Sequence, residues 1–138
     1  MTVLLGILPL IILFSLPAYP QPKIECRGLR PSNQNISIAI NGEKQKENIS
    51  KKDLVHGLSV LFADTSYKVI GFIVAYDCHS GSMIMDIHER TFYGNNIKAN
   101  DPFLNGVLEG DMLVIECINL SKKGIKYIGE PKTFLVTD

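Results

Sequence analysis

The sequence predicts an all-β fold, an antiparallel β-sandwich of about seven short strands with one short helix. Three observations lead to this prediction. Segments rich in β-branched and aromatic residues recur at short intervals, and turn residues separate them. A single segment, which begins at Asp101-Pro102, has the spacing of a real helix. Many short strands with one helical insertion are typical of two packed sheets.

The strongest predicted strand lies within Leu108–Leu120, after a Glu-Gly-Asp turn. Because side chains alternate along a strand, one face should carry Leu113, Ile115 and Cys117, and the other Met112, Val114, Glu116 and Ile118. Both faces are mainly apolar, which predicts a strand near the middle of a sheet. Glu116 then needs either a partner, such as a Lys on a neighbouring strand, or a place at the rim of a binding surface.

The other predicted elements follow in chain order. Four precede residue 77: a strand at Ile36–Ile40 ending at Asn41-Gly42, a helical turn or tight bend at Asn48–Leu54 capped by Ser50, a strand at Leu58–Phe62, and a strand at Tyr67–Tyr76 in which Gly71 marks a bulge or close approach. The later ones are a turn at Asp77–Ser82, a return strand at Met83–His88, a loop at Glu89–Asn96, the helix from Asp101 that Gly110 ends, a turn at Ser121–Gly124, and strands at Ile125–Ile128 and Thr133–Val136.

The residues at the N-terminus predict that the protein is exported. An apolar run from Val3 to Leu16 is short for a membrane span but suits a secretory signal with cleavage after Ala18. An uncleaved anchor and a buried N-terminal strand are the alternatives. We therefore expect a signal peptide at 1–18, an irregular leader at 19–34 and one domain at 35–138, located in the periplasm or on the cell surface after secretion across the inner membrane.

Charge excludes some partners. The chain has 14 basic and 14 acidic residues, a formal net charge of zero. Binders of nucleic acid usually carry a basic excess, so no nucleic-acid partner is expected. Membrane contact is expected only through the predicted signal peptide at 1–18, if it is not cleaved.

Three cysteines, Cys26, Cys78 and Cys117, cannot all pair within one chain. A Cys78–Cys117 disulfide between two strands is one hypothesis. The preferred interpretation is that all three are buried small hydrophobic residues.

The densest polar cluster is Asp77, Cys78, His79, Asp86 and His88. Cys78, His79 and His88 could supply three zinc ligands, or a thiol with a histidine base. The fourth ligand and a nucleophile motif are missing from the sequence around them. No catalytic, cofactor-binding or metal-binding residue is therefore assigned, no cofactor is expected, and a small secreted metal- or thiol-dependent enzyme built on these three residues is the alternative hypothesis.

Five segments in one order resemble the C-terminal domain of the gliding-motility protein GldM, a Bacteroidetes family. They are Ile38–Gly42, the Ile-Ser-Lys-x-Glu-Leu-like stretch Ile49–Leu54, the strand Val69–Val74, the helix and Gly110 leading to Leu113–Ile118, and Phe134–Val136 after a Gly-containing hairpin and a Pro. The match spans residues 35–138.

This resemblance implies an immunoglobulin-like β-sandwich and a non-enzymatic interaction or structural module, linked to gliding motility or type IX secretion. It also implies a protein partner in the cell envelope and allows a homodimer. The chain departs from the family plan because it has one such domain and a short N-terminal apolar run. The fold therefore carries over better than the motor function.

Overall fold

The computed structural model describes residues 20–78 and 86–138. The predicted signal peptide, His79, and the part of the predicted return strand before Asp86 lie outside these described residues. No helix in the described ranges is long and apolar enough to cross a membrane.

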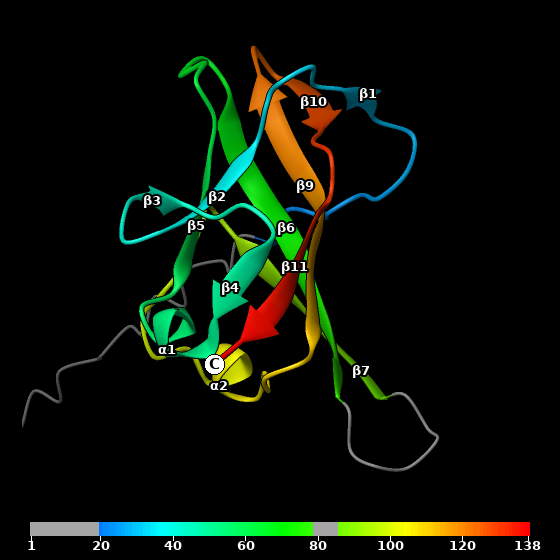
Figure 1. Ribbon diagram of the computed structural model, residues 1–138. Coiled ribbons are helices and arrows are strands. Elements are labelled where there is room, and N and C mark those ends of the chain that lie inside the picture. Colours follow the sequence, from blue (N-terminus) through cyan, green and yellow to red (C-terminus); the bar gives the residue numbers. More distant parts are fainter. Residues whose placement is uncertain (1–19, 79–85) are drawn as a thin grey trace, which may run out of the picture.

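Two sheets pack face to face, which confirms the all-β sandwich (Figure 1). The larger sheet contains β1 (Arg30–Pro31), β4 (Asn48–Ser50), β6 (Lys68–Cys78), β7 (Asp86–Tyr93), β9 (Met112–Lys122), β10 (Ile125–Ile128) and β11 (Lys132–Thr137). The smaller sheet contains β2 (Ser37–Ile40), β3 (Glu43–Lys44), β5 (Leu58–Leu61) and β8 (Asn96–Ile97). Among the described strands, β2, β5, β6, β7, β9, β10 and β11 have four or more residues and the other four are shorter.

Strand β9 lies in the middle of the larger sheet, as its sequence predicts. One of its edges runs along β6, while the other pairs with β11 in its first half and with β10 in its second half. These pairings are antiparallel, whereas the short strands β1 and β4 add in parallel to β10 and β11.

The predicted alternation along β9 is correct up to Glu116 and wrong after it. From the Ile73–Glu116 pair to the Gly71–Asn119 pair, β9 advances three residues while β6 advances two. Cys117 has a positive φ of 49°, and this bulge shifts the alternation by one residue. Ile118 is therefore buried instead of facing outward. Cys117, which was predicted on the same face as Ile115, is half-buried.

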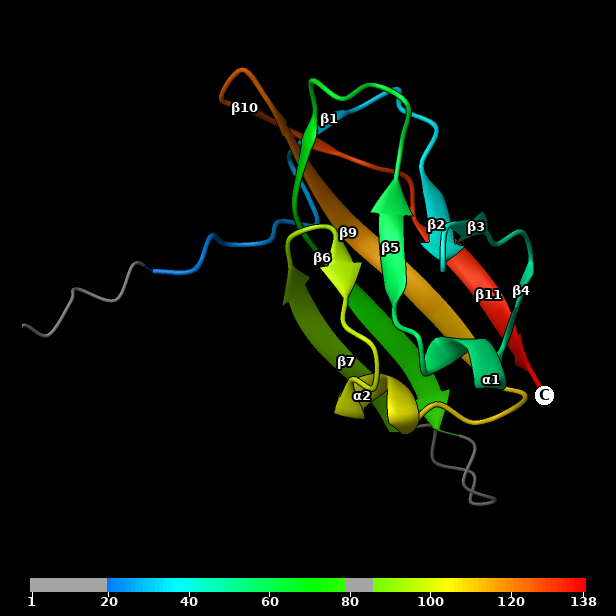
Figure 2. The ribbon, with the colours of Figure 1, turned by 90° about the vertical axis from the view of Figure 1, so that its left-hand side faces the viewer.

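The core lies between the two sheets and is closed at one end by two short helices (Figure 2). Helix α1 (Lys51–Leu54) is capped by Ser50, whose hydroxyl accepts from the Lys52 amide, and α2 (Pro102–Asn105) is capped by Asp101. The predicted helix end at Gly110 is wrong, because α2 makes a single turn that ends at Gly106. The largest fully buried side chains are Phe72, Phe134, Ile38, Ile49, Leu113, Ile115, Ile118 and Leu120.

Residues 89–96, predicted as a loop, form most of β7 and the start of β8. Side chains along β7 alternate between the core side of the sheet and the solvent side. Phe92 is buried, and its ring stacks on that of Phe72 with the centroids 5.9 Å apart, while Glu89 and Tyr93 are exposed. An edge strand with one solvated face has polar residues at every second position, and its sequence therefore resembles that of a loop.

Candidate interaction surface

One face of the larger sheet does not contact the smaller sheet, and its side chains can be assigned strand by strand. On β6, Phe72, Val74 and Tyr76 are buried in the core, so their alternating neighbours point to the opposite, outer face. The same alternation holds on β7, on β9 up to Glu116, and on β11. We call the resulting set the outer patch: Ile73, Ala75, Asp77, Ile87, Glu89, Thr91, Met112, Val114, Glu116, Thr133 and Leu135.

The register of the strands places these side chains in rows across the sheet. One row runs from Glu89 through Ala75 and Val114 to Thr133. The next row joins Thr91, Ile73 and Glu116. On the other side of the first row, Ile87 lies opposite Asp77, and Met112 lies opposite Leu135. Each row thus contains one carboxylate next to apolar side chains.

Large apolar side chains of the outer patch are exposed to solvent. The exposed fraction is 66% for Ile87, 39% for Met112 and 41% for Leu135. The surface between β6, β7 and β9 is a shallow hollow of about 220 Å³, lined by Asp77, Glu89 and Glu116 around Ala75, Ile87, Met112 and Val114. Clustered exposed apolar residues with a polar rim are typical of protein interaction sites.

The three carboxylates of the outer patch have no cationic partner among the described residues. The two ion pairs found there, Arg90–Asp101 and Lys122–Asp64, both lie elsewhere. The predicted pairing of Glu116 with a Lys on a neighbouring strand is therefore wrong: its neighbour on β6 is Ile73. This leaves the other interpretation of Glu116, a residue at the rim of a binding surface.

Beyond the outer patch, the outer face is crossed by residues 20–29, which we call the N-terminal segment and which contact the sheet through Ile24, Glu25 and Cys26. Ile24 lies directly over Gly71, where a Cβ atom would stand 2.8 Å from the Ile24 Cδ1 atom. The same Cβ would stand 2.5 Å from the Phe92 carbonyl oxygen, so the close approach predicted at Gly71 is confirmed. No side chain larger than hydrogen fits between the segment and the sheet at this point.

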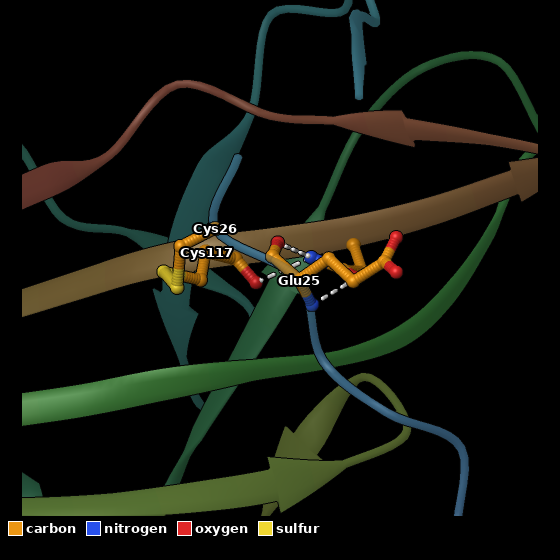
Figure 3. Close-up of a disulfide and its surroundings, with 4 residues drawn as sticks. Glu25, Cys26 and Cys117 are labelled. Atoms are coloured by element: carbon orange, nitrogen blue, oxygen red, sulfur yellow. Dashed lines mark hydrogen bonds between the residues drawn. A yellow bond between two sulfur atoms is a disulfide. The ribbon is translucent and has the colours of Figure 1, made fainter. Parts of the chain in front are cut away.

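A disulfide between Cys26 and Cys117 holds the N-terminal segment on β9 (Figure 3). Both sequence interpretations of these two residues are thereby wrong: Cys117 does not pair with Cys78, and Cys26 is exposed rather than buried. The physical reason is the bulge, which gives Cys117 a positive φ at the point where the segment crosses the sheet. The sequence contains no signal for this pairing, because it joins residues 91 positions apart.

Next to the disulfide, the buried side chain of Asn119 completes the attachment. Its Oδ1 atom accepts from the Glu25 amide at 2.9 Å, and its Nδ2 group donates to the carbonyls of Glu25 at 2.7 Å and Cys117 at 2.9 Å (Figure 3). A buried amide side chain of this kind needs partners within the protein. The segment supplies them through its backbone.

The predicted polar cluster falls at the ends of β6 and β7. Cys78 pairs in register with Asp86, and Tyr76 pairs with His88, so Cys78 and His88 lie on adjacent strands two positions apart. The His88 ring stacks on Tyr76 at 5.3 Å. His79 lies outside the described residues. In the part of the chain that the structure describes, no group of three or more Cys, His, Asp or Glu side chains is arranged to hold a metal ion.

A second hollow, which sequence reasoning missed, opens at the far end of the sandwich. It has a volume of about 430 Å³ and is lined by Val60, Phe62, Tyr67, Val69 and Asn95, with Lys68 as its charged residue. Tyr67 lies edge-on to Phe62 and Tyr127, which makes this a wall of packed aromatic rings.

Comparison of the chain with protein-family models, with curated proteins and with solved structures finds no match. The resemblance to the GldM C-terminal domain therefore stays a prediction that depends on the order of five short segments.

Proposed function

We propose that this protein is a secreted, non-enzymatic interaction module of the GldM C-terminal type, which binds a protein partner in the cell envelope through the outer patch. The observation that carries the proposal is the combination, on one rigid sheet, of exposed Ile87, Met112 and Leu135 with three carboxylates that have no partner in the described residues. A solvated face with no function needs no such apolar cluster.

The Cys26–Cys117 disulfide supports secretion. Disulfides persist in the periplasm and outside the cell, and cytosolic thiols are kept reduced. The apolar run Val3–Leu16 points in the same direction, because it has the length of a signal-peptide core. We therefore place the mature protein in the periplasm or on the cell surface, and a role in gliding motility or type IX secretion is the specific form of the proposal.

The proposal can be tested in cells by site-specific photocrosslinking. A photoreactive residue replaces Val114, which lies in the middle row of the outer patch, and a matched control replaces Glu43, an exposed residue of the smaller sheet. We expect a discrete crosslinked protein from position 114 and none from position 43. The crosslink should disappear when Asp77 and Glu116 are both changed to Lys.

Two results would overturn the proposal. One is the absence of any adduct at position 114 when the protein is folded and exported, and the other is the same set of adducts at both positions. Mass spectrometry of the mature N-terminus tests secretion separately, since a protein that still begins at Met1 contradicts a cleaved signal.

The alternative proposal is a small metal- or thiol-dependent enzyme that uses Cys78, His79 and His88. It is supported by one observation: Cys26 and Cys117 are bonded to each other, so Cys78 is the cysteine that this disulfide leaves over. Elemental analysis of the purified protein tests the metal form, and a metal-free protein removes it. Comparison of wild type with Cys78→Ser in hydrolase and thiol-exchange screens tests the other form.

A further inference from the structure

Strand β7 leaves one edge of the larger sheet open. It pairs with β6 along its whole length, and no other described strand pairs with it. At the opposite side of the sheet the terminal strands are β1 and β4, which have two and three residues and so present few unpaired backbone groups. An open strand of eight residues presents a row of backbone groups to which another chain can add.

The direction of these backbone groups follows from one hydrogen bond. The Gly94 amide donates to the Ile70 carbonyl at 2.9 Å, which makes residues 70 and 94 a hydrogen-bonded pair of the antiparallel ladder. Such pairs alternate with pairs whose backbone groups point away from each other. The N–H and C=O groups of Ile87, Glu89 and Thr91 therefore point to the open edge, and the side chains of the same three residues lie in the outer patch.

A second copy of this chain is a poor occupant of the edge. Two β7 strands that pair about a two-fold axis must place side chains of the same face opposite each other. The two registers with the largest overlap then set Glu89 against Glu89, or Arg90 against Arg90. Like charges directly opposite each other destabilise a strand pair, so the charges of β7 disfavour self-association.

A different chain with the opposite charge fits the edge. None of the residues that define the outer patch is Lys, Arg or His, and Glu89 lies on β7 between Ile87 and Thr91. On the other face of β7, Arg90 is already paired with Asp101 at 3.4 Å and lies over the Phe92 ring at 5.0 Å. At positions 87–93 of β7, the charged side chain without an ion-pair partner among the described residues is therefore Glu89, on the outer face.

We propose that an extended segment of a partner protein adds to β7 as a further strand, with a Lys or Arg opposite Glu89 and an apolar residue opposite Ile87. This inference rests on the proposed function and gives the chemistry of the partner. Backbone hydrogen bonds to residues 87, 89 and 91 supply affinity, and alternate side chains over the outer patch supply specificity.

The experiment uses the oxidised, isotope-labelled mature protein and two short blocked peptides. The first repeats Val-Thr-Lys-Thr, so that Val and Lys alternate along one face of the extended peptide, and the second has Glu in place of each Lys. Amide hydrogen exchange is followed by NMR at increasing peptide concentration, up to the millimolar range. We expect the Lys peptide to slow exchange of the amides of Ile87, Glu89 and Thr91 by about tenfold or more at saturation. The Glu peptide should leave them unchanged.

Two variants, each with a matched control variant, make the test specific. Glu89→Lys should weaken binding of the Lys peptide by about threefold to tenfold, while Glu43→Lys, the same charge change on the smaller sheet, should not. Thr91→Pro removes an outward N–H group and should abolish the protection, whereas Thr91→Ala keeps that group and should retain it. If the proline variant does not fold, the exchange measurement on the wild-type protein decides the question.

Three outcomes would overturn the inference. Binding of the Lys peptide that perturbs Met112 and Val114 without protecting the β7 amides would mean docking on the face; strand addition would then fail while the proposed function stands. Absence of binding, or equal binding of both peptides, would remove the assigned charge. Protection without peptide, together with a dimeric mass, would identify a second copy as the occupant.

Discussion

The two halves of the outer face of the larger sheet differ in how their polar groups are satisfied. In the half beneath the N-terminal segment, Asn119 is fully buried and makes three hydrogen bonds within the chain. In the half that forms the outer patch, Asp77, Glu89 and Glu116 have no cation within the described ranges, and apolar side chains beside them are exposed. The same strand, β9, passes through both halves.

The larger sheet has apolar side chains on both faces. Over one half of the outer face the chain itself provides a cover, by means of a covalent bond and buried hydrogen bonds. Over the other half it provides charges of one sign instead. Buried polar groups favour one fixed partner, whereas exposed charges favour association with a separate molecule of opposite charge.

The largest expected effect comes from removing the cover. The double variant Cys26→Ser and Cys117→Ser should lower the free energy of unfolding by about 2–5 kcal/mol, because the disulfide closes a long loop. Denaturant unfolding with and without reductant measures this loss. Exchange of the Glu25 and Asn119 region should increase, while the outer patch should not change. A loss below about 1 kcal/mol would mean that the N-terminal segment is held mainly by its noncovalent contacts.

Strand β9 offers a comparison between core and surface positions within one strand. Ile115→Ala should destabilise the protein by about 2–5 kcal/mol, because this side chain is fully buried. Met112→Ala, on the outer face of the same strand, should change the free energy of unfolding by only about 0.5 kcal/mol. Chemical denaturation of both variants checks the pair, and equal effects would contradict the assignment of faces.

Asn119 and Glu116 compare the two kinds of polar residue directly. Asn119→Ala should cost about 1–3 kcal/mol, since it leaves the Glu25 backbone groups without their partners under the segment. Glu116→Ala should stay within about 0.5 kcal/mol, as expected for a surface residue without partners. Thermal unfolding distinguishes them. A large loss for Glu116→Ala would show that this carboxylate stabilises the fold rather than a complex.

The smallest expected effect concerns a carboxylate that does have partners. The Ser66 hydroxyl, its backbone amide and Lys122 hold the pKa of Asp64 below its usual value. A depressed pKa stabilises the folded state above the pKa of the unfolded chain, about 3.9. This contribution is lost as the pH falls through the folded value. An NMR titration of the Asp64 carboxyl carbon should show the low pKa, and Ser66→Ala should raise it. An unchanged pKa in that variant would contradict the assignment to Ser66.

The amino-acid pattern alone determined the fold class and the place of β9, because alternating β-branched residues bounded by turn residues allow few other arrangements. It also predicted both helix caps, Ser50 and Asp101, which depend on residues close in sequence. It failed on β7, where exposed polar side chains on an edge strand look the same in sequence as a loop.

Tertiary structure alone decided the bulge at Cys117, the Cys26–Cys117 disulfide and the burial of Asn119. Each depends on contacts between residues far apart in the chain, and local pattern carries no record of such contacts. One extra residue in β9 changes which side chains face outward, and with it the partner of Cys117. Among residues 20–78 and 86–138, the same geometry leaves Glu116 without a Lys partner and β7 without a second neighbouring strand. The candidate interaction surface could therefore be recognised only once the strands were placed side by side.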